Sequence, residues 1–210
     1  MYKNVIKRAL DIMGALILLV LLSPLMLLTW FVVLESLGQP VLFRQRRPGR
    51  YERCFEILKF RTMLPEVLPD GTRLQERQRV SRVGLWLRAS SLDELPQLTN
   101  ILRGEMSFVG PRPLLERYLP FYSAREKLRH RVRPGLSGWA QISGRNDVEW
   151  NRRLEMDAWY AEHISLSLDL RILLATVGTV FRRDGVREDP SLVMAALDEE
   201  RSQQGTSQYA

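Results

Sequence analysis

The sequence predicts a single, mostly α-helical domain with a small β-hairpin, associated with a membrane through an N-terminal helix. Its 210 residues suffice for one well-packed core but not comfortably for two. The segment from Ile12 to Leu34 has no charged residue. A helix of that length reaches ~34 Å, enough to cross ~30 Å of hydrocarbon. Several later segments repeat apolar residues at helical spacing, which favours helices over strands.

The apolar segment is predicted to enter the membrane and return. Pro24 lies near its midpoint, where it removes a backbone donor and bends a helix, and Ser23 can bond a freed carbonyl. Basic residues flank both ends, and the positive-inside rule then puts both ends in the cytoplasm. Residues 1–37 are therefore predicted as a re-entrant helix broken at Ser23–Pro24, with a kinked membrane-crossing helix as the alternative. The flanking cations are Lys3, Lys7, Arg8, Arg44, Arg46, Arg47, Arg50 and Arg53.

The segments that follow predict a hairpin and then helices. Two short strands, Val41–Arg46 and Cys54–Phe60, surround a Pro48-Gly49 turn. A polar, proline-containing loop is expected over residues 64–79. Helices are expected over Val80–Arg88, Ser91–Leu102, Glu149–Glu162 and Leu168–Phe181, with loops over Gly104–Pro113 and Pro134–Asn146.

Two further segments complete the predicted organisation. Leu114–Arg131 is expected to be mostly helical, and its aromatic residues suit an amphipathic helix in the lipid interface. The chain from about Arg183 onward is polar, and residues 186–210 are predicted as a tail without stable structure. The aromatic and apolar residues of the interfacial prediction are Tyr118, Leu119, Pro120, Phe121 and Tyr122.

Composition limits the classes of function. The formal net charge is +7 and the sequence pI about 10.0, which suits nucleic acid, an anionic membrane or phosphorylated substrates. The single cysteine, Cys54, excludes a disulfide framework, and His130 and His163 lack zinc-site spacing. The sequence contains neither a Walker A loop nor a dinucleotide-binding glycine fingerprint. No helix-turn-helix or stacking-aromatic pattern supports nucleic-acid binding.

Asp93 and Glu94 are the strongest candidates for chemistry. They lie at the expected start of a helix, in SSLDELPQL. A carboxylate there stays ionised and can attack phosphorus to form an acyl phosphate, while its neighbour can hold Mg²⁺. The structural alternative is a capping box formed by Ser91 and Glu94, because acidic residues are common in a first turn.

Arg112 and Lys59 are candidate phosphate ligands. Pro111 and Pro113 fix the backbone on both sides of Arg112, so its guanidinium is aimed at a low entropic cost. Lys59 ends a predicted strand among apolar neighbours in LKFRTM. A solvent-facing turn and a surface lysine are the respective alternatives.

The glycine-rich segment RPGLSGWAQISGRN offers a possible nucleotide or sugar site. Its glycines permit close backbone approach, Arg145 could stack on a base and Gln141 could read the base edge. Asp157 and Asp169 lie on apolar helix faces, where an acid must be paired or used. Asp157 is the better candidate for the site, and pairing with a buried arginine is expected for Asp169.

Taken together, these motifs resemble the bacterial sugar transferases. The resemblance rests on KFRTM, SLDELPQLTNILRGEMSFVGPRPLL, RPGLSGWAQISGRN and the spacing from Asp157 to Asp169. It extends from Met1 to about Gly185, and residues 38–185 form its catalytic region. More narrowly, the chain is similar to the small monotopic phosphoglycosyl transferases, of which the N,N'-diacetylbacillosamine-phosphate transferase is one. The tail beyond Gly185 resembles nothing familiar.

The resemblance implies a ping-pong reaction at the cytoplasmic face of the bacterial inner membrane. The family's nucleophile matches Asp93, which would attack a UDP-sugar, release UMP and pass the phosphosugar to undecaprenyl phosphate. The magnesium-associated carboxylate matches Glu94, and the phosphate contacts match Lys59 and Arg112. Ser23-Pro24 matches the family's helix break. Similarity alone favours an N-acetylated amino sugar.

Other interpretations remain open from sequence. One is a non-catalytic, membrane-tethered scaffold for glycan assembly, and another is an enzyme with the same chemistry on a membrane-crossing helix. Nucleic-acid binding has only the basic pI in its favour. The oligomeric state is open, a homodimer included.

Overall fold

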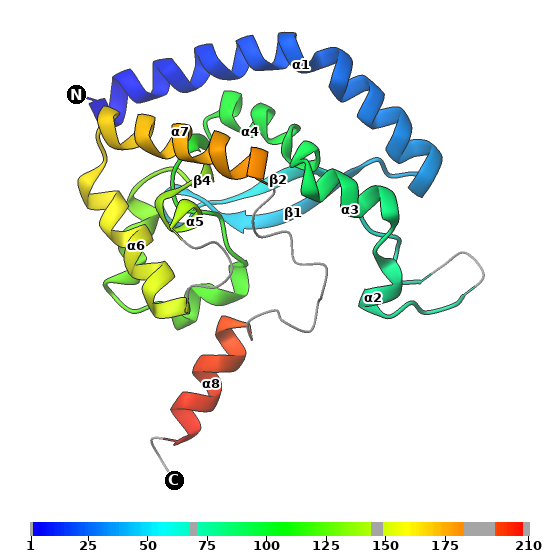
Figure 1. Cartoon of the computed structure of the whole chain (residues 1–210). Helices are drawn as coiled ribbons and strands as arrows, with labels where there is room; N and C mark the ends of the chain where they lie inside the picture. The colour runs from blue at the N-terminus through cyan, green and yellow to red at the C-terminus, as the bar shows by residue number, and fades with distance from the viewer. Residues whose placement is uncertain (1, 68–70, 144–148, 183–195, 208–210) are drawn as a thin grey trace.

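The computed structural model describes residues 2–67, 71–143, 149–182 and 196–207 and is mostly helical, with two small sheets (Figure 1). The helices are α1 (Lys7–Leu37), α2 (Glu76–Arg79), α3 (Arg82–Ala89), α4 (Gln97–Arg103), α5 (Trp139–Ile142), α6 (Trp150–His163), α7 (Leu166–Arg182) and α8 (Leu197–Ser207). The strands are β1 (Leu42–Pro48), β2 (Cys54–Phe60), β3 (Ser107–Val109) and β4 (Gly135–Ser137). Short 3-10 helices cover Arg50–Glu52, Leu92–Glu94, Glu116–Phe121 and Glu126–Arg131, and a π-helical turn covers Tyr2–Ile6.

The predicted hairpin is confirmed, and a second sheet was missed. Strands β1 and β2 pair antiparallel, with Lys59 opposite Phe43. Strands β3 and β4 pair in parallel through Ser107–Gly135 and Val109–Ser137, within segments predicted as loops. A two-stranded parallel pair this short leaves no alternating pattern in the sequence, and its strands are brought together by the intervening chain.

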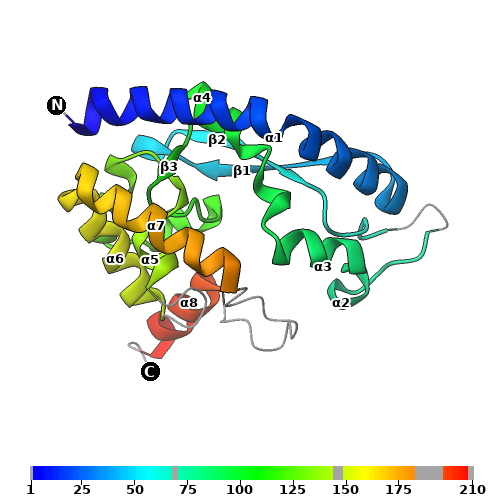
Figure 2. The same ribbon diagram turned by 45° about the horizontal axis from the view of Figure 1, so that its top comes forward.

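Helix α1 arches along one side of the molecule, and its axis changes direction partway along (Figures 1 and 2). The helical assignment continues across Ser23 and Pro24, so the expected break is a bend within one helix. Proline at position 24 cannot donate to the carbonyl of Val20. The hydroxyl of Ser23 donates to that carbonyl instead (2.8 Å), which confirms the role expected for this serine.

The N-terminal half of α1 is fastened to the rest of the fold by buried polar contacts. The ammonium of Lys7 donates to the carboxylate of Asp169 on α7 (2.6 Å), and Tyr160 donates to the other oxygen of that carboxylate (2.6 Å). Asp11 accepts from the hydroxyl of Ser107 (3.0 Å) and from the backbone amide of Phe108 (3.1 Å). The sequence predicts an arginine as the cation paired with Asp169, and in the structure this cation is Lys7.

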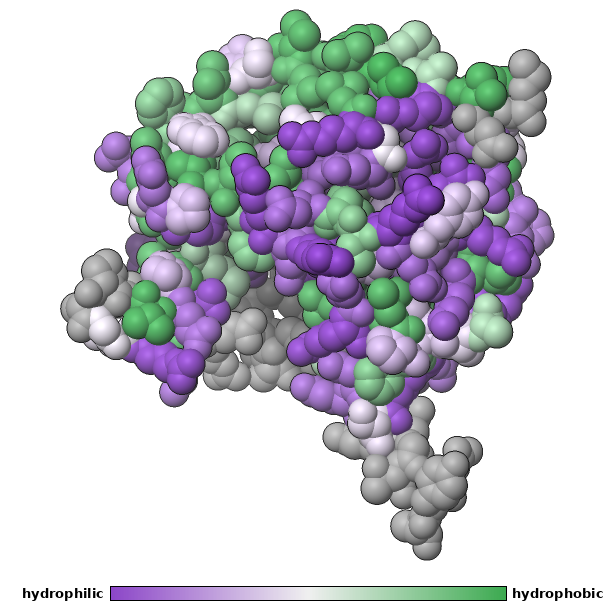
Figure 3. All heavy atoms as spheres, turned by 180° about the vertical axis from the view of Figure 1, so that it is seen from behind, coloured by the Kyte–Doolittle hydropathy of each residue, from purple (hydrophilic) through white to green (hydrophobic). Residues whose placement is uncertain are grey.

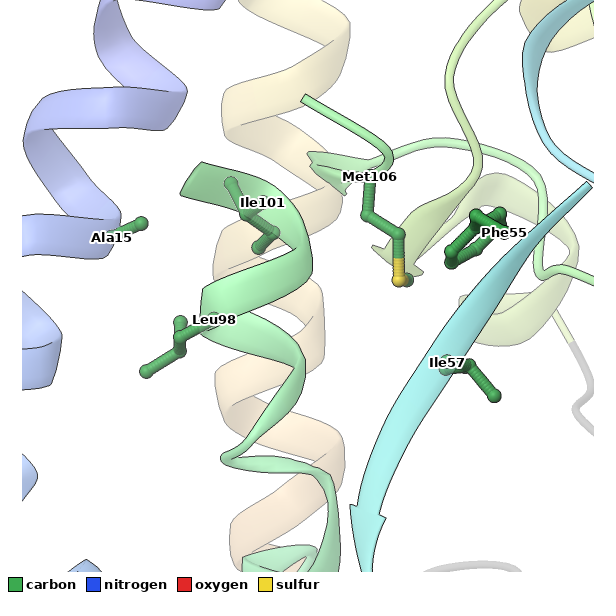
Figure 4. Packing of buried hydrophobic residues seen from close by; sticks show 6 residues of the cluster. All are labelled: Ala15, Phe55, Ile57, Leu98, Ile101 and Met106. Atoms are coloured by element: carbon green, nitrogen blue, oxygen red, sulfur yellow. The ribbon is translucent and has the colours of Figure 1, made fainter. Parts of the chain in front are cut away.

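Apolar packing fastens both halves of α1. In Figure 4, Ala15 of α1 faces Leu98 and Ile101 of α4, which pack in turn against residues from β2. Near the other end of α1, Val33 and Leu37 are buried in a second cluster. That cluster also contains Val41, Phe60 and Leu87. Both ends of α1 therefore contact the same domain.

The opposite face of α1 is exposed and apolar. Seen from behind, hydrophobic residues cover the edge of the molecule along which α1 runs (Figure 3). Helix α7 also exposes a row of apolar residues, and α3 exposes Trp86. By length and composition, α1 is the one helix among the described residues that could cross a membrane. The most exposed large residues of α1 and α7 are Ile17, Val20, Leu21, Leu27, Leu28, Phe31, Leu166, Leu170, Leu174 and Val177.

Two predictions for the C-terminal half are wrong. The segment Leu114–Arg131 forms two 3-10 helices instead of an interfacial helix, and Tyr118 and Tyr122 are buried in the core. Pro120 removes a helical hydrogen bond, and the aromatic side chains pack against α6. The tail is not structureless throughout, because α8 forms there and buries Leu197 completely.

Candidate active site

Asp93 and Glu94 lie in the tight connection between α3 and α4. A 3-10 helix, Leu92–Glu94, precedes Pro96 and the first turn of α4. Ser91 adopts a left-handed conformation (φ 56°), and its side chain makes no capping hydrogen bond. The capping box offered as the structural alternative is therefore absent, and both carboxyl groups are left for other contacts.

Glu94 is the centre of a charged cluster. Its Oε1 atom accepts from the ammonium of Lys59 at 2.6 Å and from the guanidinium of Arg112 at 2.9 Å. The side chains of Lys59 and Glu94 are 21% and 18% exposed, and that of Arg112 is 45% exposed. One carboxylate thus fixes two cations on strand β2 and on the loop after β3. The sequence proposed these three residues separately, and the fold brings them into contact.

Asp93 is 7% exposed and has no hydrogen-bond partner for its carboxyl group among the described residues. Burial, followed by the negative charge of Glu94, raises the pKa of Asp93 to about 6. Burial would also raise the pKa of Glu94, but the charges of Arg112 and Lys59 outweigh it and lower that pKa to about 2. The pKa values of the two neighbouring carboxyl groups are thereby moved in opposite directions, and Glu94 is the ionised, cation-bound one; such divergence is typical of catalytic sites.

Asn100, which has no distinctive signal in the sequence, connects helix α4 to strand β2, the strand that carries Lys59. It is fully buried on α4. Its amide oxygen accepts from the backbone amide of Leu58 (3.1 Å), and its amide nitrogen donates to the carbonyl of Glu56 (2.7 Å) and to the carboxylate of Glu105 (2.7 Å). Because Leu58 directly precedes Lys59, these bonds hold the lysine in register with the helix that follows Asp93.

Arg112 is positioned through its backbone by a second arginine. Arg129 donates to the carbonyl oxygen of Arg112 (2.6 Å) and to the carboxylate of Asp157 (2.8 Å). The side chains of Arg129 and Asp157 are only 2% and 4% exposed. Asp157 has the buried arginine partner that had been expected for Asp169. A direct contact of Asp157 with a nucleotide or sugar stays a prediction. In the structure Asp157 binds Arg129, the residue that holds the backbone of Arg112.

The remaining candidates lie in or beside the glycine-rich segment. Gln141 donates through its amide nitrogen to the carbonyl of Leu136 (3.1 Å), and its buried amide oxygen has no hydrogen-bond partner in the described parts of the chain. Trp139, two residues earlier, packs against Trp159, and their ring centroids are 5.6 Å apart. Arg145 lies outside the described residues, so its expected role on the uridine side stays a prediction.

The carboxylates of Asp93 and Glu94 could bind a magnesium ion if substrate phosphate oxygens supplied further ligands. No group of three or more His, Cys, Asp or Glu side chains gathers to hold a metal within the described parts of the chain. Oε1 of Glu94 is occupied by two cations, whereas its Oε2 atom and both oxygens of Asp93 lack described hydrogen-bond partners. Protein-bound Mg²⁺ commonly uses one or two carboxylates and takes its other ligands from substrate phosphates and water.

The cluster combines the buried carboxyl group of Asp93 with a lysine and an arginine suited to phosphate oxygens, a combination typical of phosphoryl-transfer enzymes. The chain belongs to the bacterial sugar transferase family, whose model matches residues 2–183.

Individual relatives agree with this family. The chain is 44% identical to an uncharacterised sugar transferase, EpsL, from Bacillus subtilis, over 88% of this chain and 91% of the relative. It is 37% identical to an undecaprenyl-phosphate galactose phosphotransferase from Salmonella typhimurium, over 86% of this chain and 41% of that protein. A UDP-N-acetylgalactosamine-undecaprenyl-phosphate N-acetylgalactosaminephosphotransferase from Aeromonas hydrophila is 42% identical, over 87% of this chain and 45% of that protein. This chain spans less than half the length of the latter two.

Proposed function

We propose that this protein transfers a sugar 1-phosphate from a UDP-sugar to undecaprenyl phosphate, or a similar polyprenyl phosphate, and releases UMP. The observation that carries the proposal is the single cluster formed by Asp93, Glu94, Lys59 and Arg112. Relatives whose names specify undecaprenyl-phosphate sugar phosphotransferases support the same chemistry. Their names differ in the sugar, so an N-acetylated amino sugar stays a prediction.

The first half-reaction uses Asp93 as the nucleophile. A carboxylate oxygen bonds to the β-phosphorus of the UDP-sugar, and the bond from that phosphorus to the oxygen bridging to the α-phosphate breaks. UMP leaves with the bonding electrons, and an aspartyl phosphosugar remains. Lys59 and Arg112 lie where they can neutralise charge on the phosphate oxygens, and Glu94 holds both cations in place.

The second half-reaction restores the carboxylate. An oxygen of the polyprenyl phosphate bonds to the same phosphorus, and the bond from phosphorus to Asp93 breaks. The product is a polyprenyl diphosphate-sugar. Glu94 and Asp93 are the residues that would hold Mg²⁺, and the ion would supply positive charge that stabilises the phosphate oxygens and the leaving group.

Membrane association is part of the proposal, because the acceptor is a lipid. α1 exposes many large apolar side chains, among them Val20, Leu21 and Phe31, and a contiguous exposed apolar patch is typical of an interaction or membrane surface. The contacts of Lys7 at one end of α1 and of Val33 at the other are with the same domain. This favours a re-entrant helix, with the active site at the cytoplasmic headgroup level, over a helix that crosses the bilayer.

Intact-protein mass spectrometry tests the covalent mechanism. Purified full-length protein is mixed with Mg²⁺ and, in turn, UDP-galactose, UDP-glucose and UDP-N-acetylgalactosamine, without lipid acceptor. We expect a mass increase of one phosphosugar with the cognate donor and none in Asp93→Asn, whose amide cannot form the acyl phosphate. Glu66→Gln, which alters an exposed carboxylate paired with Arg73, is the matched control and should form the adduct.

Two other outcomes would contradict the proposal in different ways. UMP release only when polyprenyl phosphate is present, with no adduct, would mean direct transfer and return Asp93 to a supporting role. No UMP from any donor, with or without acceptor, would favour the scaffold interpretation.

A further inference from the structure

Helix α8 lies outside the family match, which ends at residue 183, yet it is docked on the catalytic region (Figures 1 and 2). Leu197, its first residue, is fully buried. The cluster that encloses Leu197 contains side chains from two places: the segment after Pro113 and helix α6. Its buried members are Leu114, Tyr118, Tyr122, Trp150 and Leu154.

A polar clamp reinforces this docking. The guanidinium of Arg201 donates to both carboxylate oxygens of Glu126, at 2.8 and 2.5 Å, and to the carbonyl of Phe121. It also donates to the side-chain oxygen of Asn151 on α6 (3.0 Å). The side chains of Arg201 and Glu126 are 18% and 9% exposed. The ion pair is bidentate and largely shielded from solvent. Removing one partner would leave the other charge buried without compensation, which costs more free energy than in an exposed pair.

The clamped segment leads directly to the candidate phosphate ligand. Tyr122, one residue after Phe121, accepts through its hydroxyl from Arg129 (3.0 Å). Arg129 donates in turn to the carbonyl of Arg112 and to Asp157. Helix α8 and the backbone of Arg112 are thus both in contact with the segment between Leu114 and Val132.

We propose that α8 is a positioning element of the donor-phosphate site. Leu197 and Arg201 fix the Glu116–Arg131 segment, which contains Tyr122 and Arg129. Arg129 in turn binds the backbone carbonyl of Arg112 and so positions its guanidinium. The inference rests on the proposed function, because its readout is the affinity for a UDP-sugar. It assigns α8 to the donor half-reaction and predicts no effect on recognition of the lipid acceptor.

The test compares the apparent KM for the UDP-sugar and for the polyprenyl phosphate in full-length variants. Removing one partner of a charged, largely buried hydrogen bond should raise the donor KM about fivefold to tenfold in Arg201→Ala, while the acceptor KM stays within error. Arg201→Lys keeps the charge and should lie between the wild type and Arg201→Ala. The matched control is Arg125→Ala, because Arg125 sits in the same segment but forms exposed pairs with Glu155 and Glu162.

Each result decides the matter. An active wild type, with Arg201→Ala and a second variant, Leu197→Asp, both retaining the wild-type donor KM, would overturn the role of α8 and leave the proposed function intact. Equal losses for donor and acceptor, in Arg201→Lys as well, would mean that α8 stabilises the fold in general, which also overturns the inference. An inactive wild type would instead count against the proposed function.

Discussion

The carboxyl group of Asp93 lies in surroundings that oppose its charge. It is buried, its sequence neighbour Glu94 is ionised, and Lys59 and Arg112 are hydrogen-bonded to that neighbour. The raised pKa of about 6 means that the ionised form becomes dominant only near neutral pH. A nucleophile with these properties is less solvated and more reactive than a surface carboxylate.

The pH dependence of the reaction should report this pKa. Attack requires the ionised form of Asp93, so the donor kcat/KM should fall with a slope of about one as the pH drops below about 6. Glu94, with a pKa of about 2, stays ionised throughout and adds no step above pH 4. Steady-state rates between pH 4.5 and 8 measure this profile. A rate that stays constant down to pH 4.5 would show that Asp93 titrates like an ordinary aspartate.

Residue by residue, the sequence identified the charged groups but not their supports. Asp93, Glu94, Lys59 and Arg112 stand in distinctive local settings, beside a proline, a helix start or a strand end. Asn100 and Arg129 have no such signal, because an asparagine on a helix and one arginine among many look like surface residues. Only tertiary contacts distinguish them.

At the scale of elements, α1 combines a bend with attachment at both of its ends. The bend needs Pro24 and the hydroxyl of Ser23, which takes over the carbonyl that proline frees. The attachment needs Asp169 at one end and the Val33 cluster at the other. The proline bends the helix, and the contacts hold both of its ends against the same domain, as the proposed re-entrant path requires.

Changing the proline alone should therefore leave the topology unchanged. Pro24→Ala restores a backbone donor and straightens α1, but Lys7 remains bound to Asp169. Combining Pro24→Ala with Asp169→Asn should move an N-terminal epitope tag to the outer surface in part of the population. Antibody labelling of intact and permeabilised cells measures the exposed fraction.

Asp169→Asn alone is the control and should keep the tag inside. If Pro24→Ala by itself exposes the tag fully, the proline sets the topology and the contacts at the end of α1 do not. An unchanged double variant would mean that the flanking cations suffice.

Elements fixed by local pattern were predicted well, and those fixed by distant contacts were not. The hairpin of β1 and β2 follows from two short strands around a turn, and α3, α4, α6 and α7 follow from apolar spacing. The parallel pair of β3 and β4 depends on residues far apart in sequence. The buried aromatic residues Tyr118 and Tyr122 were mistaken for interfacial ones, because a core and a lipid interface select the same side chains.

For the whole molecule, the distribution of apolar surface predicts how the proposed membrane attachment is achieved. Exposed leucines and valines lie along α1 and α7, and the net charge is +7. Attachment by charge is screened by salt, whereas attachment by apolar burial is not. Because the exposed side chains of α1 are predominantly apolar, we expect the apolar contribution to be the larger one.

Extraction experiments should separate the two contributions. Membranes that contain the protein should retain it in 1 M NaCl, where the Debye length is about 3 Å, and release it only with detergent. Immunoblotting of pellet and supernatant measures the retained fraction. Release by salt alone would mean that the basic surface, and not α1, holds the protein at the bilayer.

The contacts of Lys7 and Asp11 with Asp169, Ser107 and Phe108 have a consequence for how such proteins can be rearranged. A membrane helix joined to an enzyme by a linker is a module, and another helix of equal length can replace it. Here α1 supplies side chains to the folded interior, so the helix and the rest of the domain depend on each other for folding. A foreign helix of equal length without Lys7 and Asp11 would leave Asp169 and Ser107 without these partners.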